Sequence, residues 1–126
     1  MSAFAPLRTF LAGDTPNQMS KIITVDCDQI SDWASFHRVF ADAFKFPSFY
    51  GKNSAAWVDC LTHPSEMTDV GLTDEDIITI QLRGEQNLKG RAPKLLEEIF
   101  ELAAFVNYRR LEAGEPGRLC VSAFLE

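Results

Sequence analysis

Residues 46–63, FPSFYGKNSAAWVDCLTH, contain the side chains of this chain that are best suited to bind another molecule. Two ring residues, Phe49 and Tyr50, lie in a segment whose proline and glycine are typical of an irregular loop. Asp59 follows in a helix-forming run. A carboxylate accepts charge-assisted hydrogen bonds from Arg, Lys and His side chains. Rings beside a carboxylate therefore predict a surface that binds a cationic cleft on another protein.

A short helix is predicted to position the carboxylate of Asp59. The helical run covers residues 54–61, directly after the loop. Asn53 is well suited to cap this helix, because its side-chain oxygen can accept a free amide hydrogen of the first turn. The predicted helix would thus hold Asp59 in a fixed direction next to the ring residues.

Cys60 and His63 suggest a different chemistry, since a thiol and an imidazole lie about one helical turn apart. A Cys–His nucleophile needs a base that a third group orients, and no such group accompanies this pair. A zinc site needs four ligands, and the three Cys and two His of the chain are scattered without paired spacing. Cys60 is therefore predicted to be structural, with an enzyme using Cys60 and His63 as a minor alternative.

Two further groups of titratable side chains have structural interpretations. His37 is predicted to lie at the surface or boundary of a helix. Glu97, Glu98 and Glu101 are predicted to form the solvated face of a later helix, with an acidic docking strip for a partner as the alternative. No cofactor, metal or catalytic residue is predicted for this chain.

Predicted strands alternate with predicted helices along the chain. Three runs predict strands, at residues 21–25, 76–82 and 118–125. Helices are predicted over about residues 32–44, 54–61 and 93–111. Residues 63–74 are predicted to be mostly loop. Residues 85–90 are predicted to be a polar connection with a helical turn. Strands separated by helices imply parallel pairing, so the sequence predicts an α/β domain with a small three-stranded parallel sheet covered by helices.

The segment FPSFYGKN followed by AWVDCLT resembles the barstar signature, a Tyr-Tyr-Gly-x-Asn loop that leads into an Ala-Leu-Trp-Asp-Cys-Leu-Thr helix. Barstar-like proteins are intracellular inhibitors of secreted bacterial ribonucleases. The resemblance extends more loosely from residue 21 to residue 125. It implies a three-layer barstar-like fold over residues 21–126, preceded by an N-terminal extension at residues 1–20.

The resemblance also implies a set of contact residues. Asp59 matches the central acid of the family, which enters the ribonuclease active site in place of a substrate phosphate. The ring residues and Asn53 match the approach loop, although Phe49 lacks the hydroxyl of the family Tyr. The alternative is that the two rings cap the core. His63 replaces a family Gly. The predicted partner-binding residues are Phe49, Tyr50, Gly51, Asn53, Trp57, Val58, Asp59, Thr62 and His63.

Three departures from the family pattern bear on the partner. Ala55 stands where the family has a contact Asp. Trp57 and Val58 replace Leu-Trp, which moves the indole by about 100° around the helix and can turn it toward the core. Arg109 and Arg110 lie in a region where the family carries acids, so this basic pair would repel a basic ribonuclease. These departures leave an alternative open, a barstar-like interaction module or immunity protein whose partner is not a ribonuclease.

Length and charge agree with a protein-binding domain. A chain of 126 residues is large enough for one domain with its own core. The net charge of −6 disfavours nucleic acid or an anionic membrane as a partner, because both are polyanions. The charge is compatible with a secreted bacterial ribonuclease or a related basic toxin, although many cytosolic proteins are mildly acidic.

Cysteine use and apolar patterning predict a cytoplasmic protein, and the resemblance implies a bacterial protein that is a monomer when free. Cys27, Cys60 and Cys120 form an odd set without paired close spacing, which favours reduced thiols. No apolar run approaches the roughly 20 residues that span a bilayer. The N-terminal residues lack the basic start and continuous apolar run of a signal peptide.

Overall fold

The computed structural model of the chain describes residues 20–123, so the predicted extension lies almost entirely outside the described residues. The elements follow in the order β1 (Ser20–Asp26), η1 (Cys27–Gln29, a 3-10 helix), α2 (Trp33–Phe44), α3 (Ser54–Thr62), α4 (Pro64–Met67), β2 (Ile77–Arg83), α5 (Glu85–Arg91), α6 (Pro93–Glu112) and β3 (Leu119–Ala123). Strands and helices alternate along the chain as the sequence predicts.

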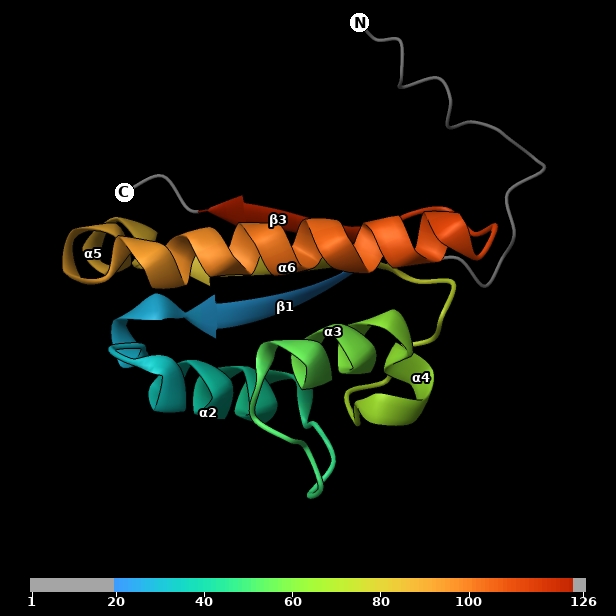
Figure 1. Cartoon of the computed structure of the whole chain (residues 1–126), viewed down its shortest axis with the longest axis horizontal. Coiled ribbons are helices and arrows are strands. Elements are labelled where there is room, and N and C mark those ends of the chain that lie inside the picture. Colours follow the sequence, from blue (N-terminus) through green and yellow to red (C-terminus); the bar gives the residue numbers. More distant parts are fainter. Residues whose placement is uncertain (1–19, 124–126) are drawn as a thin grey trace, which may run out of the picture.

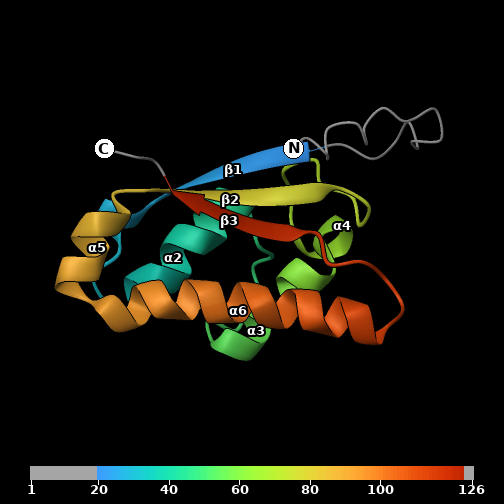
Figure 2. The same ribbon diagram turned by 90° about the horizontal axis from the view of Figure 1, so that it is seen from above.

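The three strands form one parallel sheet in the order β1-β2-β3. Ile23, Ile80 and Val121 are in register across the sheet and belong to the core or pack against it. Alternate positions such as Ile22 face away from the core and are exposed, since successive strand residues point to opposite faces. Figure 2 shows that α2, α3 and α6 lie on one side of the sheet. The predicted α/β class with a parallel three-stranded sheet is confirmed.

The helices build two layers on the sheet. Helix α2 packs on β1 and α6 packs on β3, while α3 packs on α6 (Figure 1). The rings of Phe40 on α2 and Trp57 on α3 meet edge to face, with centroids 5.4 Å apart. Aromatic and branched side chains from every layer form one apolar core, which includes Phe36, Phe40, Phe44, Trp57, Leu61, Ile80, Leu82, Ile99 and Val106. Burial of these side chains holds the layers together.

Side-chain caps fix where the helices of the site begin. The Asp32 carboxylate accepts the Ser35 amide hydrogen at 2.8 Å in a capping box that starts α2. The Asn53 side-chain oxygen accepts the Ala56 amide hydrogen at 2.8 Å, as predicted for the helix that carries Asp59. Helix α2 ends at Phe44, and the next residue, Lys45, has a left-handed φ of 55° that turns the chain into the loop.

Two short helices differ from the sequence-based expectation. Helix α4 lies in the segment predicted to be mostly loop, and α5 is a full helix where a polar connection with a helical turn was expected. The Arg91 guanidinium at the end of α5 donates to the carbonyls of Cys27 and Ile30 at 2.9 and 2.7 Å. This contact is distant in sequence, so a local pattern does not reveal it.

Arg110 has a structural role, which corrects its predicted place in an exposed basic pair. Its side chain is buried. The guanidinium donates to the carbonyls of Thr62 at 3.2 Å, Asp74 at 2.7 Å and Pro116 at 3.2 Å. It also lies 3.1 Å from a carboxylate oxygen of Glu115. Arg110 thus ties the end of α3 to the loop before β2 and to the turn after α6.

Replacing Arg110 should destabilise the fold much more than replacing its neighbour. Arg110→Ala leaves the buried Thr62 carbonyl and two partly buried contacts without their donor and empties a buried site, and we expect a loss of about 3 kcal/mol in the free energy of unfolding. Arg109→Ala is the matched control and should cost no more than about 1 kcal/mol, because its ion pair is partly exposed. Urea denaturation measures both values. Equal losses in the two variants would contradict the structural role of Arg110.

Candidate functional site

Phe49 and Asp59 are the exposed centre of the candidate surface. The side chain of Phe49 is 74% exposed on the loop between α2 and α3. Asp59 lies on the exposed side of α3, and both residues line one shallow hollow together with Gly51, Ala56 and Met67. The structure therefore brings the exposed ring and the carboxylate together, as the sequence pattern predicts.

Asp59 is paired with a cation of its own chain. The Arg109 Nη1 atom on α6 donates to Asp59 Oδ1 at 2.8 Å. The Asp59 and Arg109 side chains are 56% and 38% exposed, so the pair lies at the surface. Arg109 was predicted to add a repulsive charge at the rim of the surface. Its position instead makes the centre of the surface a carboxylate–guanidinium pair.

Several predicted contact residues have their side chains in the interior. Trp57 has no exposed surface, and Val58 and Thr62 are also buried. The Thr62 hydroxyl donates to the Val58 carbonyl at 2.6 Å within α3. The partner-binding role of these three stays a prediction, but their side chains hold α3 in the core in this conformation. Gly51, Asn53 and His63 are exposed beside them.

Tyr50, the second predicted surface ring, is buried instead and anchors the loop from beneath. Its hydroxyl shares a 2.6 Å hydrogen bond with His37 Nδ1 on α2, and its ring lies 4.7 Å from the ring of Phe46. Both partners of the hydrogen bond are buried, so His37 is not the surface or boundary residue that its helix position suggested. Burial raises the pKa of Tyr50, so the phenol keeps its proton. Burial lowers the pKa of His37 despite the opposing effect of Glu98.

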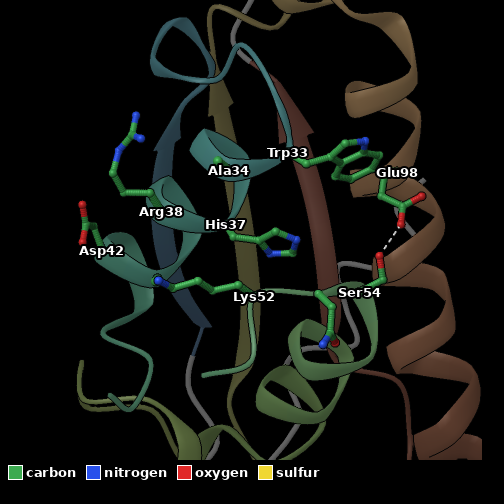
Figure 3. A pocket seen from close by; sticks show the side chains of 10 residues that line it. Trp33, Ala34, His37, Arg38, Asp42, Lys52, Ser54 and Glu98 are labelled. Atoms are coloured by element: carbon green, nitrogen blue, oxygen red, sulfur yellow. Dashed lines mark hydrogen bonds between the residues drawn. The ribbon is translucent and has the colours of Figure 1, made fainter. Parts of the chain in front are cut away.

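An open groove runs beside the loop, between α2 and α6. The rings of Trp33 and His37 point from α2 toward the hydrogen bond that Ser54 donates to Glu98 at 2.7 Å (Figure 3). Glu98 was predicted to lie on a solvated face with Glu97 and Glu101, but this contact ties it to the first residue of α3. A long-range pair of this kind has no signal in the local sequence.

Cys60 is poorly placed for nucleophilic chemistry. It is buried, and burial followed by the charge of Asp59 raises its pKa to about 11. The thiol is therefore protonated at neutral pH. His63 is exposed, and within residues 20–123 no hydrogen bond joins it to Cys60. The geometry agrees with a structural role for Cys60.

The described part of the chain contains no group of three or more His, Cys, Asp or Glu side chains arranged to hold a metal ion. None of the helices within residues 20–123 is long and apolar enough to cross a membrane.

Comparison with known proteins gives one family. The family model described as Barstar (barnase inhibitor) matches residues 20–121. No curated protein matches the chain. The matched range includes the loop, α3, α6 and all but the last residues of the sheet.

The buried imidazole should make stability depend on pH. The pKa of His37 in the folded protein lies below its ordinary value of 6.5 because of burial. The unfolded chain therefore binds more protons in this range. The neutral His37 imidazole therefore contributes its full stabilisation of the fold above about pH 7. This stabilisation decreases as the pH falls through 6.5 toward the lower pKa of His37 in the folded state. Urea denaturation between pH 7.5 and 5.5 should show this loss.

The chain has two histidines, which provides a matched control. His37→Gln should flatten the dependence of the unfolding free energy on pH in this range. His63→Gln is the control, because it also removes an imidazole but from an exposed position. If the unfolding free energy of His37→Gln depends on pH as steeply as that of wild type, another group causes the pH dependence.

Proposed function

The chain belongs to the barstar family, and from this premise we propose that it is a protein inhibitor of a ribonuclease. In this proposal the exposed loop around Phe49 and the helix α3 cover the active site of the enzyme. The observation that carries the proposal is the half-exposed carboxylate of Asp59, held on a capped and buried helix beside an exposed aromatic ring.

The chemistry of the enzyme explains why a carboxylate suits this role. A ribonuclease must bind an anionic phosphate, so its active site presents Arg, Lys and His side chains. The carboxylate of Asp59 offers acceptor oxygens to the same donors. Because Asn53 caps α3 and Trp57 is fully buried, little conformational freedom remains to be lost on binding. The aromatic ring of Phe49 adds apolar area beside the carboxylate.

Charge supports the encounter of the two proteins. The net charge of −6 attracts a basic enzyme at a distance and raises the association rate at low salt. The partner in this proposal is a secreted bacterial ribonuclease or a related basic toxin. The inhibitor acts as a cytoplasmic monomer that needs no cofactor. It protects the cell before export of the enzyme or against the toxin of a neighbour.

A second candidate is a protein-interaction module, or an immunity protein, whose partner is not a ribonuclease. Two observations favour it. Ala55 is exposed where the family has an acid, and the remaining acid at the centre is already paired with Arg109. Both features reduce the negative potential that a phosphate-binding cleft would meet.

Titration of wild type and Asp59→Ala against purified secreted bacterial ribonucleases tests the proposal, with a fluorogenic RNA as the substrate. We expect one-to-one inhibition that weakens as salt is raised. The Asp59→Ala variant should bind on the order of 30-fold more weakly or worse, which is typical of a charged anchor at an interface. Glu75→Ala, at another exposed acid, should behave as wild type.

Circular dichroism of each variant separates a lost contact from a lost fold. A wild type that inhibits no ribonuclease would reject the proposed function and favour the second candidate. Inhibition that Asp59→Ala leaves intact would show that another part of the surface blocks the enzyme.

A further inference from the structure

The ion pair at the centre of the surface uses only part of the bonding capacity of its two groups. Arg109 Nη1 contacts Asp59 Oδ1 at 2.8 Å. Among residues 20–123, neither side chain makes another hydrogen bond. A carboxylate has two oxygens and a guanidinium has five N–H groups. The second oxygen of Asp59 and the other N–H groups of Arg109 are therefore open to an external partner.

A partner that covers Asp59 must also cover Arg109, because the two groups are in contact. In the free protein both are partly exposed, so water satisfies their remaining hydrogen-bonding groups. In an interface this water is removed, and a charged group left without a partner costs several kcal/mol. A cleft that contains only cations would satisfy Asp59 and place like charges against Arg109.

We infer that Asp59 and Arg109 bind their partner as one dipolar unit, and that Arg109 determines which partner is bound. This inference rests on the proposed function. The cleft that fits has a cation for the free oxygen of Asp59 and a carboxylate for the free N–H groups of Arg109. Guanidinium and carboxylate form strong, directional pairs, so this second contact adds selectivity.

The chemistry of RNA cleavage says which enzymes have such a cleft. Cleavage needs a general base close to the phosphate-binding groups, and enzymes use either a histidine or a carboxylate for this purpose. The inferred contact of Arg109 is the carboxylate base of such a ribonuclease. A ribonuclease whose acid and base are both histidines offers Arg109 no anionic acceptor at this place and is disfavoured.

Exposed aromatic residues on α6 continue the surface beyond the pair. Phe105 lies one helical turn before Arg109, and its ring stacks on that of Tyr108 with centroids 6.3 Å apart. Both rings are about half exposed, and Phe49 borders Asp59 on the loop side. Rings around a charge pair exclude water when a partner covers them, which strengthens the charged contacts inside.

Purified ribonucleases of the two classes are the probes for this inference. Binding of wild type and Arg109→Gln is measured by calorimetry against an enzyme with a carboxylate base and against one with two catalytic histidines. For the first enzyme we expect Arg109→Gln to weaken binding about 30-fold. The weakening should disappear when the carboxylate base of that enzyme is replaced by its amide. For the two-histidine enzyme, Arg109→Gln should bind more tightly than wild type.

Lys94→Gln, at an exposed cation near the start of α6, is the control for net charge and should change neither affinity appreciably. Tighter binding of Arg109→Gln to both enzymes would overturn the inference, since Arg109 would then only compete for Asp59. The proposed function would stand in that case. If neither wild type nor Arg109→Gln binds any ribonuclease, the proposed function fails and the inference fails with it.

Discussion

The buried side of α3 is the constraint on which the position of the candidate surface depends. Trp57 meets Phe40 of α2 in the core, and Leu61 belongs to the same apolar cluster. Arg110 holds the end of the helix through the Thr62 carbonyl. Asp59 lies on the opposite side, so its direction follows from the packing of its neighbours. A rigid acid in this chain is thus a consequence of core packing and of one buried guanidinium.

The adjacent arginines of α6 show how helix geometry assigns different roles to identical residues. Successive residues point about 100° apart around a helix. Arg109 is thereby directed to the surface beside Asp59, while Arg110 enters the interior and bonds main-chain carbonyls. Read as a pair of charges, they predict repulsion of a basic partner. In the fold, one residue stabilises the connection between elements and the other changes the chemistry of the binding surface.

The sequence predicts those parts of the fold whose signals are local. The β-branched run of β2, the Asn53 cap and Pro93 in the first turn of α6 each act within a few residues, and their elements form as expected. Helix α4 has four residues, too few for an apolar period to be visible. The partners of Tyr50, Ser54 and Asp59 lie 13, 44 and 50 residues away, so only the fold brings them together. The exposed ring and acid were predictable, but their neighbours were not.

Attraction and selection have separate origins on this surface. The net charge of −6 is spread over the chain and acts over a distance comparable to the Debye length, about 8 Å at physiological ionic strength. At contact, Ala55 and Arg109 make the centre of the surface much less negative than the chain as a whole. A basic protein is therefore attracted in general, while tight binding depends on groups that match both members of the ion pair. The sequence changes that weaken a purely electrostatic contact are the same changes that allow discrimination between basic partners.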